Sequence, residues 1–192
     1  IVYGAKNPHV YAQIDSKADA LAHIRRLKAQ GAHSIKNYNQ PRRDQRQQVV
    51  AAAIEENMRS VAEGGSLFGL DMTLIADGNT TVEHNVPVET FYQDVQQFFS
   101  RSKVGYTPTL VVTYGGPAAD PYWRAHTDVW KQPLLQKHVP ESVLIANNAR
   151  RTIAPEDNYV DAESAREAAK LARLGAPVSI GAHGPEPGIA AH

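Results

Sequence analysis

Strand-like and helix-like segments alternate along the chain, and this alternation restricts the fold more than any other feature. We expect strands at 1–5, 33–38, 59–62, 80–83, 106–113 and 177–180, and helices at 16–30, 41–57, 67–76, 88–100 and 161–174. Strands separated by single helices form parallel sheets with right-handed crossovers. The pattern therefore predicts an α/β protein, either a doubly wound open sheet or an arc of a (β/α)8 barrel.

The length and composition bound what such a chain can be. Its 192 residues are enough for one domain, 1–192, with a long insertion at 118–158. Both ends look cut from the interior of a longer protein, so we expect a fragment. Lys and Arg total 20, as do Asp and Glu, so no basic bias indicates nucleic-acid binding.

Several classes of site find no support in the sequence. There is no cysteine, which excludes disulfides and thiolate metal sites. No apolar run approaches the roughly 20 residues of a membrane span. Neither a Gly-x-Gly-x-x-Gly motif after the first strand nor a Walker loop is present, so nucleotide binding is disfavoured.

Four predicted strands end in side chains that can bind metal or transfer protons: Lys36, Glu63, His84 and His183. In α/β folds the carboxyl ends of parallel strands carry the functional site. Each residue also has a purely structural interpretation. Lys36 can extend into solvent, Glu63 can be a solvated turn residue, His84 can cap a helix, and His183 can accommodate an unusual turn. Their joint occurrence at one edge favours a functional site.

The chemistry of this set suggests a metal centre. Imidazole and carboxylate ligands suit a divalent ion, Zn²⁺ being the expected one, and one or two ions can be held. A bound metal lowers the pKa of water toward ~7 and so supplies hydroxide at neutral pH. Lys36 can join such a centre only after losing its charge, and carbamylation by CO2 would convert it to a bridging carboxylate.

Short motifs resemble those of the amidohydrolase superfamily, in its imidazolonepropionase-like and dipeptidase-like branch, and most of all members fused to Tol-type β-propeller repeats. The motifs are Gly31-Ala32-His33-Ser34-Ile35-Lys36, Thr80-Thr81-Val82-Glu83-His84, Tyr106-Thr107-Pro108-Thr109-Leu110 and Ala176-Pro177-Val178-Ser179-Ile180-Gly181. The resemblance implies a partial (β/α)8 TIM barrel, about strands 3 to 8, with Lys36 carboxylated and His84 bound to metal. It also implies hydrolysis of an amide, lactam or ester-like bond in a small-molecule or peptide-like substrate, in a periplasmic or secreted protein.

The chain departs from the family pattern at two strand ends. The family's fifth strand ends in a metal-binding histidine, whereas this chain has Ala62-Glu63-Gly64, so we expect Glu63 to be a substitute ligand. The eighth strand of the family ends in an aspartate that is ligand and base. Here His183 stands in its place, and we expect it to act as ligand and catalytic proton carrier. The His-x-His pair of the family's first strand is absent, so we expect the chain as given to bind metal weakly or not at all and to be inactive or impaired as a hydrolase.

Aromatic and basic residues near the strand ends are secondary candidates. Tyr38 and Tyr114 are expected to hydrogen-bond substrate. The aromatic residues of the insertion form either a substrate wall or a small separate core; they are Tyr122, Trp123, His126 and Trp130. Three arginines after the lysine strand are expected to be a solvated helix start, with binding of a substrate carboxylate as the alternative; they are Arg42, Arg43 and Arg46.

Two other functions remain open at this point. The altered fifth and eighth strand ends are compatible with a non-catalytic barrel that serves as a scaffold. A doubly wound α/β enzyme could also use histidine as acid and base without metal, and strand order would separate it from a barrel. Because an opened barrel leaves unpaired strand edges, we further expect the chain to form homo-oligomers.

Overall fold

The computed structural model describes residues 14–38, 42–113, 119–149 and 153–183. Strands and helices alternate in the α/β order that the sequence predicts. The expected strand at 1–5 and the expected helix start at Pro41 lie outside the described residues.

A parallel sheet forms the centre of the molecule. Its strands are β1 (Ser34–Asn37), β2 (Arg59–Glu63), β3 (Thr81–Glu83) and β4 (Gly105–Thr107), in the spatial order β1-β2-β3-β4. Beyond β4, Tyr106 forms a parallel bridge to Val178. Neighbours in the sheet are thus consecutive in the chain, and the order does not reverse anywhere in the described part. A doubly wound sheet contains such a reversal, so this order counts against that alternative.

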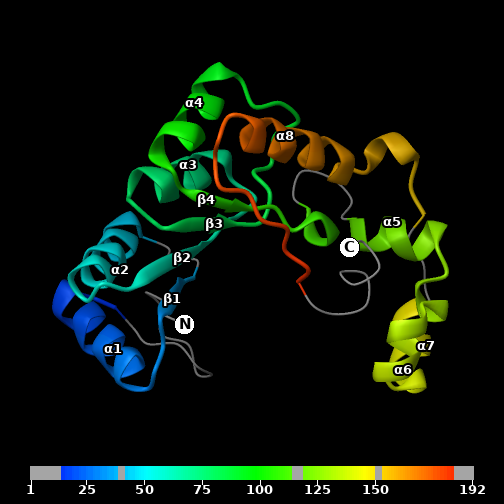
Figure 1. Cartoon of the computed structure of the whole chain (residues 1–192), viewed down its shortest axis with the longest axis horizontal. Helices are drawn as coiled ribbons and strands as arrows, with labels where there is room; N and C mark the ends of the chain where they lie inside the picture. The colour runs from blue at the N-terminus through cyan, green and yellow to red at the C-terminus, as the bar shows by residue number, and fades with distance from the viewer. Residues whose placement is uncertain (1–13, 39–41, 114–118, 150–152, 184–192) are drawn as a thin grey trace.

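Five helices lie along one side of this sheet (Figure 1). They are α1 (Lys17–Ala29), α2 (Arg43–Glu55), α3 (Phe68–Ala76), α4 (Gln93–Ser102) and α8 (Asp161–Arg173). The predicted helix start at Ser16 is confirmed, because its side chain accepts a hydrogen bond from the Asp19 N–H at 3.1 Å. The helices cover the sheet face on which every second strand residue is buried.

Two apolar clusters fill the space between the sheet and these helices. One joins β1 to α1 and α2 through Ile35, Ile24 and Val49. The other joins β2, β3 and β4 to α3, α4 and α8, and it contains the stacked rings of Phe91 and Phe99. Each fully buried side chain of this size contributes on the order of 2–3 kcal/mol. The clusters leave the opposite face of the sheet mainly to polar residues, although Val61 also lies on it.

Three predicted elements differ from the structure. The helix expected from Val88 begins only at Gln93, because backbone N–H groups of the preceding segment bond elsewhere: Val86 N–H to the Tyr106 hydroxyl at 3.1 Å and Phe91 N–H to Glu167 at 3.0 Å. The strand expected at 106–113 ends at Thr107, since Pro108 has no N–H to extend the ladder, and a 3-10 turn, η1 (Leu110–Val112), follows.

The last expected strand, 177–180, is reduced to a short parallel contact with β4. Tyr106 N–H donates to the Pro177 carbonyl at 2.9 Å, and Ser179 N–H donates to the Tyr106 carbonyl at 2.9 Å. This contact still places the end of the segment beside the end of β4.

The insertion at 118–158 carries short helices: α5 (Ala119–His126), η2 (Val129–Lys131), α6 (Pro133–His138), α7 (Glu141–Asn148) and η3 (Glu156–Asn158). Val129, Leu135 and Leu144 form a cluster of their own, against which Trp123 and Trp130 pack. Figure 1 shows α6 and α7 away from the sheet. The tryptophans therefore belong to a separate small core.

Among the described residues, no helix has both the length and the apolar character needed to cross a membrane.

Candidate functional site

The polar face of the sheet brings Lys36 and Glu63 together. Ile35 and Asn37 are buried toward the helices, so Lys36 between them points to the opposite face. In the register of β1 and β2, Lys36 lies beside Val61, and Glu63 follows two residues later on the same face. The Lys36 Nζ atom lies 2.5 Å from Oε2 of Glu63, an ion pair that crosses the two strands diagonally.

The same carboxylate reaches the next strand. His84, directly after β3, is buried, and its Nε2 atom is 2.9 Å from Oε1 of Glu63. His84 N–H donates to the carbonyl of Thr107 at 2.9 Å, which fixes its backbone against β4. Glu63 thus joins Lys36 to His84 across three strand ends.

His183 completes the row of side chains. Its ring lies edge-on to that of His84, with centroids 5.4 Å apart, and its side chain is exposed. Both histidines have positive φ, 70° for His84 and 53° for His183. Such backbone angles cost about 1–3 kcal/mol for non-glycine residues and are concentrated at functional sites. The structure therefore brings together all of the strand-end residues that the sequence singled out.

Glu63 is ionised in this setting. Burial alone would raise the pKa of its carboxyl, but the hydrogen bonds from His84 and from Lys36 outweigh burial and lower the pKa below its ordinary value. The centre therefore contains a carboxylate held between a lysine ammonium and an imidazole.

A second carboxyl, Asp71 of α3, lies behind the site and was not recognised from the sequence. It is 1% exposed, and one oxygen accepts the Gly65 N–H at 2.9 Å. Burial raises its pKa to about 7. The signal in the sequence is its position one turn before Leu74 and Ile75, on the stripe that packs against the sheet.

The carboxylate and imidazole groups of the site are chemically suitable ligands for a divalent ion, but they are not arranged around a common ion position. Within the described ranges, no group of three or more carboxylate or histidine side chains is placed to hold a metal ion. The Glu63 oxygens instead face His84 and the Lys36 ammonium. A metal centre at these residues remains a prediction, and so do the ligand roles of Lys36, Glu63, His84 and His183.

The secondary candidates are distributed differently. The Tyr38 ring lies beside the centre, with its centroid 5.0 Å from Nζ of Lys36, whereas Tyr114 lies outside the described residues. The side chains of Arg42 and Arg43 are exposed, as expected for a solvated helix start, and they pair with the exposed side chain of Asp44 and the buried side chain of Asp77. The prediction was wrong for Arg46, which is buried between α2 and α3, where its guanidinium bonds the Thr73 hydroxyl at 3.3 Å.

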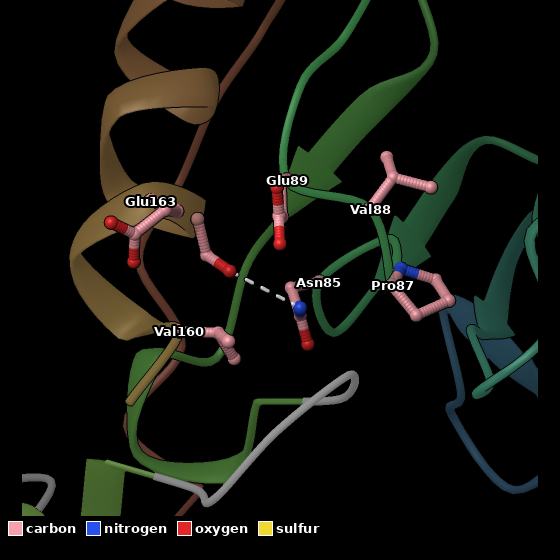
Figure 2. A pocket seen from close by; sticks show the side chains of 7 residues that line it. Asn85, Pro87, Val88, Glu89, Val160 and Glu163 are labelled. Carbon is pink, nitrogen blue, oxygen red and sulfur yellow. Dashed lines mark hydrogen bonds between the residues drawn. The ribbon is translucent and has the colours of Figure 1, made fainter. Parts of the chain in front are cut away.

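A pocket of about 170 Å³ begins one residue beyond His84. Its lining residues come from the segment after β3 and the first turn of α8 (Figure 2): Asn85, Pro87, Val88, Glu89, Val160, Glu163 and Ser164. Asn85 donates to the Ser164 hydroxyl at 3.2 Å across the pocket. This bond ties the segment after His84 to α8.

Comparison with protein-family models gives no match, and comparison with curated proteins gives none either. Among solved structures, the chain is similar to a Xaa-Pro dipeptidase with methionine bound in its active site, at a TM-score of 0.51 and 15% identity over 88% of this chain. It is also similar to an uncharacterized protein, at a TM-score of 0.54 and 16% identity over 90% of this chain. A bottromycin amidohydrolase is similar at a TM-score of 0.48 and 18% identity over 91% of this chain.

The first two likenesses show a shared fold. The chain spans about two fifths of the length of these solved structures, namely 38%, 39% and 41%. The activity of the whole protein is therefore a matter for proposal.

Proposed function

We propose that the protein is a hydrolase of the amidohydrolase type, which cleaves an amide, lactam or ester-like bond at the row Lys36, Glu63, His84 and His183. The observation that carries the proposal is that Glu63 contacts both Lys36 and His84 at the carboxyl ends of the strands. The consecutive parallel strand order and the likeness in fold to a Xaa-Pro dipeptidase support it. The sheet is then an arc of a (β/α)8 barrel.

The buried and the exposed side chains of the site have different proposed roles. Glu63 and His84 are buried and bonded to each other, so they provide a rigid, charged floor for the site. His183 is exposed at its rim, where its imidazole can take a proton from water and return it to the leaving group. The Tyr38 ring beside Lys36 offers one wall for substrate.

We further propose that one or two divalent ions, Zn²⁺ in particular, bind once Lys36 is carbamylated. In that reaction the Lys36 ammonium first loses one proton, and the neutral amine then forms an N–C bond to CO2 and loses a second proton, so the charge at residue 36 changes from positive to negative. The new carbamate would repel the Glu63 carboxylate that now contacts Nζ at 2.5 Å. A cation between them would remove this repulsion, so modification and metal binding should occur together.

The experiment is metal analysis and dipeptide hydrolysis after incubation of the chain with Zn²⁺ and bicarbonate. Because the first-strand His-x-His pair is absent, we expect weak zinc binding and at most weak hydrolysis in the parent chain, and the same in Lys17→Ala, which removes an exposed lysine paired with Glu55 at 2.7 Å. Both should be lost in Lys36→Ala. Zinc binding or hydrolysis that persists at the level of the parent chain in Lys36→Ala would contradict the proposal.

The second candidate is a non-catalytic scaffold module. It is favoured by the lack, among the described residues, of a group placed to hold metal. That interpretation predicts side chains more than about 8 Å apart, beyond the reach of a shared ion with bonds of about 2.0–2.2 Å. The contacts of 2.9 Å from Glu63 to His84 and 5.4 Å between the histidine rings go against it.

The substrate, the oligomer and the location remain predictions. We propose a small-molecule or peptide-like substrate, homo-oligomers in solution and a periplasmic or secreted protein, with no role in nucleic-acid binding. Light scattering over a range of concentrations tests the oligomer, because a constant monomer mass would contradict it.

A further inference from the structure

The Asp71 carboxyl is buried on the side of α3 that packs against the sheet, where burial of a polar group costs free energy. Its side chain is 1% exposed, and although Oδ1 accepts the Gly65 N–H at 2.9 Å, Oδ2 has no hydrogen-bond partner among the residues that the structure describes. A buried polar atom without a partner costs free energy, so its retention requires a compensating role.

The groups around Asp71 indicate that role. The Gly64–Gly65 turn follows Glu63 directly, and its Gly64 N–H donates to the Glu83 carbonyl at 2.9 Å. A Cβ atom on Gly64 would lie 2.2 Å from that carbonyl and 3.4 Å from Oδ1 of Asp71. The turn is therefore held between the end of β3 on one side and the Asp71 carboxyl on the other.

This turn determines where the Glu63 carboxylate lies. Glu63 is the last residue of β2, so the backbone beyond it at Gly64 and Gly65 sets the direction of its Cα–Cβ bond. A change of direction would separate the carboxylate from Nε2 of His84, which is 2.9 Å away. Residues that fix the turn therefore act on the contact between Glu63 and His84.

We propose that Asp71 is a positioning residue of this centre: through Gly65 and Gly64 its acceptor oxygen holds Glu63 in contact with His84. The inference depends on the proposed function only for the roles given to Glu63 and His84. It assigns importance to the acceptor oxygen rather than to the charge, so Asn should replace Asp at this position.

The test uses the full chain without metal or substrate and records the ring ¹⁵N and ¹H signals of His84 by NMR, with thermal unfolding as a check of folding. At pH 5, below the Asp71 pKa of about 7, the carboxyl is neutral like the amide that replaces it, so Asp71→Asn should leave the His84 signals unchanged, whereas Asp71→Ala should shift them. The matched control is Asp77→Asn at the other end of α3, whose side chain is also 1% exposed but pairs with Arg43. It should leave His84 unchanged.

Three results would overturn the proposal. They are unchanged His84 signals in a folded Asp71→Ala protein, changed signals in Asp71→Asn, and a shift in the Asp77→Asn control as large as that in Asp71→Ala. If Asp71→Ala does not fold, Asp71→Asn still decides, because the acceptor oxygen alone must preserve the signals. Since neither metal nor substrate is present, failure of the proposed hydrolase function would leave this outcome unaffected, and the two can be distinguished.

Discussion

Glu63 and His84 are hydrogen-bonded at 2.9 Å, although 21 residues of the chain separate them. The contact exists because β2 and β3 are parallel neighbours that end at the same edge, with Glu63 opposite Glu83. His84, one residue further, turns back toward β2 through its positive φ of 70°. Sheet register and one unusual backbone angle together make the contact.

Replacing Glu63 by Gln should disable the centre without unfolding the chain. The amide retains the shape of the side chain but removes the charge that faces Lys36 and His84. A hydrogen bond to a charged group is worth about 1.5–3 kcal/mol, so a loss of stability of this size is expected in urea unfolding. Under the proposed function, hydrolysis should fall on the order of 100-fold or more.

The control for this variant is Glu55→Gln. Glu55 is an exposed carboxylate that pairs with Lys17 and Arg25 on the outside of α1 and α2. Its replacement should change stability by less than about 0.5 kcal/mol and leave hydrolysis intact. Equal effects of the two substitutions would show that the contacts of Glu63 with Lys36 and His84 contribute no more than an exposed ion pair does.

Stability should fall as pH rises through neutrality because of Asp71. Burial raises its folded-state pKa from 3.8 to about 7, so between these values the folded chain binds more protons than the unfolded chain. The free energy of unfolding then decreases with pH over this window, by up to about 4 kcal/mol, and levels off above it. Urea unfolding between pH 5 and 8 measures this slope.

Asp71→Asn isolates the contribution of this carboxyl. In the variant, the free energy of unfolding should no longer decrease with pH over this window. The difference in unfolding free energy between parent and variant should therefore grow as the pH rises. The pKa of Glu63 is lowered, so its contribution to stability is lost only when the pH falls below the ordinary pKa of a glutamate. Glu63 therefore does not affect the pH dependence of stability above pH 5. Parallel pH profiles of the two proteins would contradict the assignment.

Gly64→Ala should destabilise the chain at the end of β2. The added methyl would lie 2.2 Å from the Glu83 carbonyl, a backbone atom that cannot move without disturbing β3. Overpacking of this kind costs about 1–3 kcal/mol. Gly69→Ala in α3 is the matched control, since nothing lies within 4 Å of its Cβ, and it should stabilise the helix by about 1 kcal/mol. Thermal unfolding of both proteins tests the contrast.

Tyr106→Phe should loosen the segment that follows His84. The Tyr106 hydroxyl, in the fully buried core, accepts the Val86 N–H at 3.1 Å. Its removal leaves a buried donor unsatisfied, which costs about 1–3 kcal/mol and should raise amide exchange at Val86. Tyr92→Phe, at a ring that is 74% exposed, should have no measurable effect in the same unfolding and exchange experiments.

The order of the elements could be predicted from the sequence because its signals are local. Alternation of apolar residues and caps such as Ser16 act within a few residues, so α1, α3 and α8 appear close to their predicted ranges. The beginning of α4 and the end of β4 were misplaced, because they depend on Glu167, Pro108 and the Tyr106 hydroxyl rather than on periodicity. Glu167 and Tyr106 come from other parts of the chain, whereas Pro108 directly follows β4 and ends the strand locally.

The sequence by itself determined which chemical groups end the strands: a lysine, a carboxylate and two histidines. Only the tertiary structure decided how they meet, because the register of β1 and β2 places Lys36 diagonally against Glu63. The role of Asp71 became visible only in the tertiary structure, because the free energy of placing a carboxyl there depends on how deeply α3 buries it against the sheet. Periodicity along a chain assigns residues to faces, whereas pairing between strands and packing between layers decide which side chains touch.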